Sequence, residues 1–119
     1  MRRRNAVVIG AVLPATLLLL SGGALAEPRV FELSIRNSEL PGDRRVVQVT
    51  QGDDVTLRWS TDKALTIHLH GYDIEQKLTP GKPVPMRFTA RATGRFPIEV
   101  HVHGGGGGRT LGHLEVHPR

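Results

Sequence analysis

The sequence predicts an all-β domain, an antiparallel Greek-key β-sandwich or barrel of seven to eight strands. Apolar and polar residues alternate with a period of two through almost all of residues 27–119, as they do in half-buried strands. Residues that favour turns interrupt this alternation every several positions, and no segment keeps a helical period. Many short strands separated by regular turns are typical of sandwiches and small barrels.

Each expected strand is a short alternating run bounded by Gly, Pro, Asn or Asp. The expected strands are residues 30–35, 45–50, 55–60, 65–70, 72–78, 84–88, 96–103 and 111–116. In the third strand Val55, Leu57 and Trp59 share one face, so Trp59 is expected in the core. Proline cannot donate a backbone hydrogen bond, so Pro83 and Pro85 predict that the sixth strand begins at a sheet edge.

The first 26 residues have the pattern of a secretory signal peptide. A basic start, Arg2 to Arg4, precedes an apolar stretch over residues 6–20, and Ala24-Leu25-Ala26 supplies the small residues of a cleavage site. The apolar stretch is short for a membrane span, so an uncleaved anchor is disfavoured. We therefore expect cleavage after Ala26, a single domain over residues 27–119, a periplasmic or secreted location, and no membrane anchor after cleavage.

Charge and cysteine content exclude several function classes. The chain is formally +5, but removing three of its 16 basic residues with the signal peptide leaves 13 against 11 acidic residues. With few aromatic residues and no Lys/Arg stripe, the mature domain gives little support for nucleic-acid binding. There is no cysteine, which excludes disulfides, thiolate ligands and cysteine-based catalysis.

Two His-x-His pairs are the main chemical signal in the sequence. His68 and His70 end one expected strand, and His101 and His103 end another. Side chains two apart on a strand lie on the same face, roughly 6.6–6.8 Å apart, so each pair points away from an apolar face. Imidazole is a common ligand for copper and zinc. If the two strand ends meet, the four histidines form a metal site.

Four segments of the mature chain resemble the cupredoxins in order and spacing. They are Gln48 to Leu57, His70 to Ile74, Gly94 to Val100 and Leu111 to Val116. The resemblance implies the cupredoxin fold over nearly all of the mature chain. It also implies that His70 and His103 occupy the family's two histidine-ligand positions, at one pole of the barrel.

The chain departs from the family pattern at the other two ligands. The cysteine position falls on Val100, and Thr110 and Leu111 stand where the axial methionine is expected. A blue-copper electron-transfer site depends on a copper–thiolate bond, so this chain cannot build one. His68 and His101 have no counterpart in the family pattern.

Three further polar residues, Glu99, His113 and His117, lie on the expected outward faces of their strands. Glu99 shares the face of His101 and is expected either to accept a hydrogen bond from an imidazole, orienting it, or to form a cross-strand charge pair. His113 and His117 flank the outward face of the last strand. We expect those two histidines to be solvated and not to bind metal.

The leading hypothesis is an exported, non-enzymatic metal-binding protein. Cu(II) is the favoured ion and zinc an alternative, with His70, His103, His68 and His101 as ligands, because Cu(II) leads the first-row divalent ions in affinity for nitrogen ligands. Its partners would be the metal ion and another extracytoplasmic copper-handling protein. The first alternative is an interaction module without metal. The second is a small metal-dependent enzyme, since His-x-His also occurs in copper–zinc superoxide dismutase and in three-histidine zinc sites.

Overall fold

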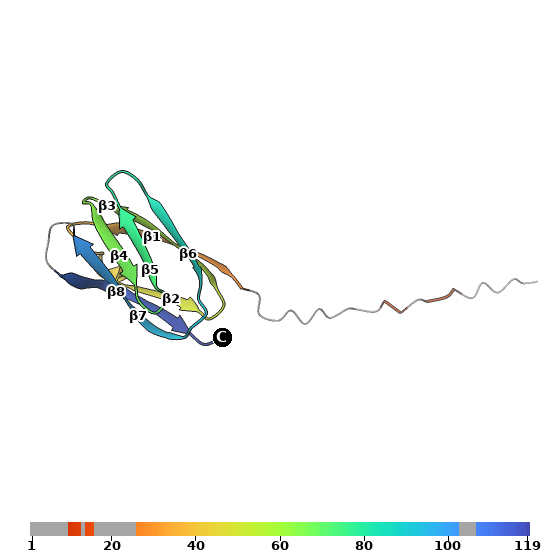
Figure 1. Ribbon diagram of the computed structural model, residues 1–119. Helices are drawn as coiled ribbons and strands as arrows, with labels where there is room; N and C mark the ends of the chain where they lie inside the picture. Colours follow the sequence, from red (N-terminus) through yellow and green to blue (C-terminus); the bar gives the residue numbers. More distant parts are fainter. Residues whose placement is uncertain (1–9, 13, 16–25, 103–106) are drawn as a thin grey trace, which may run out of the picture.

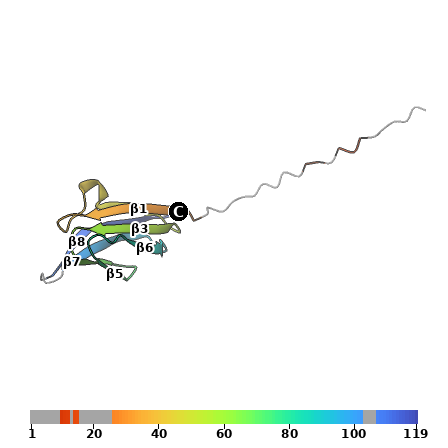
Figure 2. The ribbon, with the colours of Figure 1, turned by 90° about the horizontal axis from the view of Figure 1, so that it is seen from above.

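The computed structural model describes residues 10–12, 14–15, 26–102 and 107–119. Eight strands form two sheets that pack on each other (Figure 1, Figure 2). The strands are β1 (Pro28–Ile35), β2 (Val46–Thr50), β3 (Asp54–Thr61), β4 (Leu65–Leu69), β5 (Ile74–Leu78), β6 (Val84–Thr89), β7 (Gly94–Val102) and β8 (Gly108–His117). A 3-10 helix, Gly42–Arg44, lies in the turn before β2. The all-β prediction and each of the eight expected strands are confirmed.

The strand order is β1-β3-β6 in the smaller sheet and β2-β8-β7-β4-β5 in the larger sheet. Four ladders are antiparallel, but β1 pairs with β3 and β2 pairs with β8 in parallel. From the strand pattern we expected antiparallel pairing throughout. Alternation does not distinguish the two directions, because a strand shows the same period of two in either kind of ladder. As Pro83 and Pro85 predicted, β6 is an edge strand.

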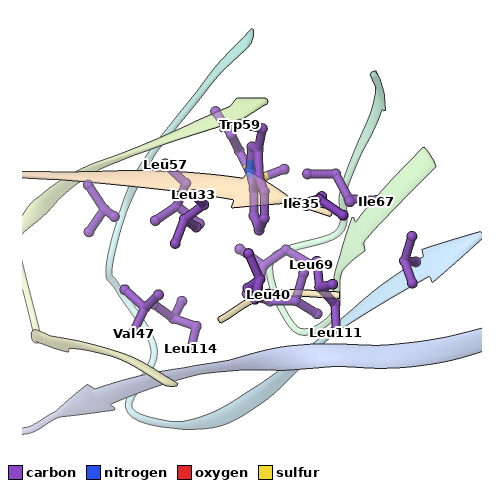
Figure 3. Close-up of a cluster of buried hydrophobic side chains, with 14 of the residues drawn as sticks. Leu33, Ile35, Leu40, Val47, Leu57, Trp59, Ile67, Leu69, Leu111 and Leu114 are labelled. Carbon is purple, nitrogen blue, oxygen red and sulfur yellow. The ribbon is translucent and has the colours of Figure 1, made fainter. Parts of the chain in front are cut away.

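The core lies between the two sheets (Figure 3). Leu33 and Trp59, from the smaller sheet, are buried against residues such as Leu69 and Leu114 from the larger one. Trp59 is 0% exposed, which confirms its predicted place in the core. Complete burial of an apolar side chain is worth about 1.5–3 kcal/mol, so this layer is the main source of stability in a domain that has no disulfide.

The turn after β4 is held by a glycine and an aromatic contact. Gly71 has a φ of +81°, and a Cβ there would overlap the ring of Phe96. The ring of Tyr72 contacts Phe96, with the two centroids 5.1 Å apart. The Tyr72 hydroxyl donates to the carbonyl of Ala92 at 2.8 Å, and burial raises the pKa of Tyr72. These contacts set the path of the chain directly after His70.

In the portion of the chain that the structure describes, no helix is long and apolar enough to span a membrane.

Candidate metal centre

The ladder between β4 and β7 brings the first His-x-His pair beside Glu99 and His101. Leu65, Ile67 and Leu69 point into the core and are 0% exposed, so alternation turns His68 to the outer face of the larger sheet. In the antiparallel register His68 lies opposite Glu99. His101 lies one step further along β7, opposite Thr66.

Four side chains then form a continuous row of contacts, which we call the histidine face: His68, His70, Glu99 and His101. The rings of His68 and His70 lie with centroids 4.2 Å apart. His70 Nε2 lies 3.2 Å from Glu99 Oε2, and His101 Nε2 lies 3.8 Å from the same oxygen. Glu99 therefore connects histidines from two strands.

The row is open and not a closed cage. Among the residues for which the structure gives positions, no three His, Asp or Glu side chains are grouped so that they could hold a metal ion. His68 Nε2 lies 3.6 Å from Asp73 Oδ1, so an exposed carboxylate outside the row contacts this ring. Metal binding by the histidine face would require a rotation of at least one side chain or a further donor.

His70 carries an unusual nitrogen. Its ring is 39% exposed, yet the Nε2 atom itself is buried and forms no hydrogen bond. Glu99 Oε2 lies within ion-pair distance of this nitrogen, at 3.2 Å, without forming a hydrogen bond to it. Buried polar atoms in native proteins nearly always have a partner, and an unpaired imidazole nitrogen beside a carboxylate is suited to a metal ion.

Backbone features position the other two members of the face. The pairing of β7 with β8 shifts register between Ile98 and Glu99, and such bulges re-aim side chains near functional sites. His101 lies opposite Gly108 on β8, and a Cβ at Gly108 would overlap the His101 imidazole. The absence of a side chain at Gly108 therefore lets the ring lie across β8.

The prediction that the two His-x-His strands end at one pole is wrong for the described residues. Leu69, at the end of β4, pairs with Ile98, whereas Val102, at the end of β7, pairs with Leu65 at the start of β4. β7 therefore ends beside the start of β4, whereas β4 ends beside the middle of β7. This result follows from the antiparallel direction of the ladder, and it moves the candidate site from a pole to a sheet face.

Sequence reasoning ranked the four histidines differently from the structure. His68 and His101, which had no family counterpart, lie in the row with His70. His103 lies outside the described residues, so its role as a ligand stays a prediction. Asp73 was missed, because its contact with His68 depends on the turn after β4, where Asp73 has a φ of +54°.

The remaining histidines lie on the last strand, as expected. His113 Nδ1 lies 3.4 Å from Arg95 Nη2, and His117 Nε2 lies 3.5 Å from Glu115 Oε2. His113 is half-buried and His117 is exposed. Neither contacts the histidine face through any ion pair or hydrogen bond that the described residues make.

The donor set fits a borderline divalent ion. The histidine face offers imidazole nitrogens and one carboxylate, which suit Cu(II) and zinc. His70, Glu99 and His101 would be the residues to hold such an ion, which would supply positive charge to balance the carboxylate of Glu99. Of the two readings for Glu99, the geometry supports contact with imidazoles: it lies near two histidines, and its partner across the ladder to β4 is His68.

No protein-family model matches the sequence, and no curated protein matches it. Solved structures do match. A copper-binding protein, solved by NMR in its apo form, aligns with a TM-score of 0.59 at 10% identity, over 79% of this chain and 99% of that chain. A blue copper oxidase from Nitrosomonas europaea aligns with a TM-score of 0.58 at 23% identity, over 78% of this chain and 40% of that chain.

A chain in the cryo-EM structure of a heme-copper terminal oxidase dimer also aligns, with a TM-score of 0.60 at 18% identity. The alignment covers 74% of this chain and 64% of that chain. The chain therefore spans less than two thirds of the length of both oxidase chains. The matches show a cupredoxin-like fold, which confirms the expectation from the sequence resemblance.

Proposed function

We propose that the protein is an exported, non-enzymatic domain that binds Cu(II) through the histidine face. Its role would be to capture, buffer or deliver copper outside the cytoplasm, where a second copper-handling protein would be its partner. The observation that carries the proposal is the row itself: Glu99 lies between His70 and His101, His68 contacts the ring of His70, and a buried His70 nitrogen has no hydrogen bond.

The ligand chemistry favours Cu(II) over other ions. Imidazole nitrogens bind Cu(II) more tightly than the other first-row divalent ions, with zinc below it. Cu(I) prefers thiolate and thioether ligands, but the chain has no cysteine and its Met86 is buried in the core. The half-exposed position of the face on a sheet suits an ion that is exchanged with a partner. The signal-peptide pattern of residues 1–26 supports an extracytoplasmic role.

Titration with Cu(II) and Zn(II) by calorimetry, followed by electron paramagnetic resonance of the copper complex, tests the proposal. We expect saturable Cu(II) binding, hyperfine coupling to imidazole nitrogen, and a weak visible band with no intense thiolate absorption. An intense blue colour, or the absence of any saturable binding, would contradict the site. Absent binding would favour the alternative of an interaction module without metal.

Single substitutions assign the ligands. His70→Ala is expected to weaken Cu(II) binding most, because His70 contacts both Glu99 and the ring of His68, and His68→Ala and His101→Ala to weaken it less. His117→Ala is the matched control, because His117 is exposed and lies away from the face. If Cu(II) affinity survives the double replacement of His70 and His101, the metal is bound elsewhere.

A further inference from the structure

A second polar site lies beside the histidine face, at the start of β2. A cavity of about 440 Å³ opens between β7, β8 and the segment that precedes β2. Small-molecule sites typically have volumes of roughly 300–1,000 Å³. The cavity is lined by Ser38, Glu39, Arg45, Val46, Arg95, Arg109, Thr110, Leu111, Gly112 and His113.

The pairing of β2 with β8 explains why a cavity forms here. β2 begins at Val46, opposite His113, so the preceding half of β8 lies beside an irregular segment and not beside a strand. The backbone of that segment approaches closely, since His113 N donates to the carbonyl of Arg45 at 2.8 Å. A Cβ at Gly112 would overlap the same carbonyl oxygen. Gly112 therefore permits this approach at one wall of the cavity.

Three arginines from separate segments line the cavity, and two of them are held in place. Arg109 Nη2 donates to the carbonyl of Ser38 at 3.0 Å and to Glu39 Oε1 at 3.1 Å. Arg45 Nε donates to the carbonyl of Leu40 at 3.2 Å, and its Nη2 lies 3.9 Å from Glu39 Oε2. Glu39 is thus shared by two guanidinium groups and orients both.

Arg95 lies on the other wall with a less complete set of partners. Its Nη1 is 3.8 Å from Glu115 Oε1, and its Nη2 is 3.4 Å from His113 Nδ1. Glu115 is not part of the lining, so the cavity wall carries three guanidinium groups against the single carboxylate of Glu39. The local charge is positive, and all three arginine side chains remain more than half exposed.

We propose that this arginine pocket binds a small polyvalent oxyanion, whose carboxylate or phosphate oxygens reach Arg95 and one of the two anchored arginines. Guanidinium groups match both kinds of oxyanion through paired hydrogen bonds. The contacts of Arg45 and Arg109 with backbone carbonyls hold them before a ligand arrives, which lowers the entropy cost of binding. The inference does not depend on metal binding by the histidine face.

Binding is tested on the metal-free protein, prepared with a chelating resin, by NMR titration with inorganic pyrophosphate and with tricarballylate. Acetate is the monovalent reference. We expect saturable shifts at residues 110–113 with at least one polyvalent probe and weaker binding of acetate. The stronger of the two probes identifies the ligand as a phosphate or a carboxylate. If neither probe produces saturable shifts up to about 10 mM, which corresponds to less than about 3 kcal/mol of binding free energy, the proposal is wrong.

Single substitutions distinguish specific binding of the oxyanion in the arginine pocket from its nonspecific attraction to a basic surface. Arg95→Gln should weaken binding at least tenfold, because it removes the charged guanidinium group that donates hydrogen bonds to the oxyanion. Arg95→Lys keeps the positive charge but removes the paired N–H donors of the guanidinium group, so we expect an intermediate loss of affinity. Arg87→Gln is the charge-matched control, because Arg87 is exposed, lies on β6 in the smaller sheet and does not line the cavity. This change should alter affinity less than twofold.

An equal loss in Arg95→Gln and Arg87→Gln would overturn the proposal, because it would show that only net charge matters. If Arg95→Gln does not fold, the comparison of Arg95→Lys with Arg87→Lys decides between the same outcomes. Since all these measurements are made without metal, a failure to bind oxyanions leaves the copper proposal unaffected. A failure to bind copper likewise leaves the oxyanion proposal unaffected.

Discussion

Two clusters of charged and polar side chains in this molecule differ in how fully they are satisfied. One surrounds Asp53, which is 1% exposed. Its carboxylate accepts hydrogen bonds from Thr50 N at 3.0 Å and Arg119 Nη2 at 2.5 Å, and Arg29 Nε lies 3.5 Å away. The other cluster is the histidine face, which is half-exposed and leaves the Nε2 atom of His70 without a hydrogen bond.

The difference separates a structural cluster from a candidate binding site. The hydrogen bond from Thr50 is the main cause that lowers the pKa of Asp53, and Arg119 and Arg29 lower it further, although burial acts in the opposite direction. Every contact of that carboxylate favours its ionised form, so Asp53 contributes to folding. The histidine face has donors that its own neighbours do not use, so it is the better candidate for a ligand.

The largest expected effect is the loss of stability when the hydrogen-bonded carboxylate of Asp53 is removed. Asp53→Ala should lower the free energy of unfolding by about 2–3 kcal/mol, because Thr50 N and the Arg119 guanidinium lose a charged acceptor. Urea unfolding measures this loss. Cu(II) affinity of the folded variant should be unchanged. Asp54→Ala is the control: Asp54 is an exposed neighbour that accepts one hydrogen bond, from Thr89, and should cost much less. A comparable loss in both variants would remove the distinction between the clusters.

The two clusters should also respond to pH in separate windows. A carboxyl group whose pKa is lowered by folding contributes stability that is complete above its unfolded value of about 3.8 and is lost as the pH falls further. Copper binding should weaken earlier, as the pH falls from about 7 to 5, because protons compete with Cu(II) for the nitrogens of the ligating imidazoles. Calorimetric titrations of Cu(II) and urea unfolding at several pH values check both windows. Cu(II) affinity that stays constant from pH 7 to 5 would exclude histidine ligation.

Gly112→Ala should lower the stability of the domain. Its new Cβ would overlap the carbonyl oxygen of Arg45, a backbone atom that cannot move away without displacing the start of β2. Overpacking of this kind costs about 1–3 kcal/mol. Thermal unfolding of the variant measures the loss. A variant as stable as the parent would show that the segment before β2 can shift freely.

Gly108→Ala is expected to have the smallest effect of these substitutions. It should change Cu(II) affinity more than it changes the stability of the fold. The overlap there is with the imidazole of His101, a side chain that can rotate. Holding a side chain off its preferred rotamer costs about 0.5–1.5 kcal/mol, so Cu(II) affinity should fall about two- to tenfold. The melting temperature should change little. Unchanged affinity would show that His101 is not a ligand.

The site was only partly predictable. The type and placement of the strands followed from alternation, and so did the outward direction of His68 and His101, because a period of two assigns each residue to a face. The prediction of a shared pole failed because it required the relative direction of β4 and β7. Nothing in the sequence of either strand encodes that direction. The contact between His68 and Asp73 and the arginine pocket were also missed, because they arise at turns and at a strand junction.

The sequence by itself determined the all-β class, the eight strands, the buried faces with Trp59 in the core, and the absence of any thiolate chemistry. These properties are local or compositional, so no long-range information was needed. The tertiary structure decided the two parallel ladders and the antiparallel pairing of β4 with β7. It thereby placed Glu99 between His70 and His101, and it brought Arg45, Arg95 and Arg109 together. Each of these contacts joins residues that are far apart in the chain, and packing of the two sheets selects which strands become neighbours.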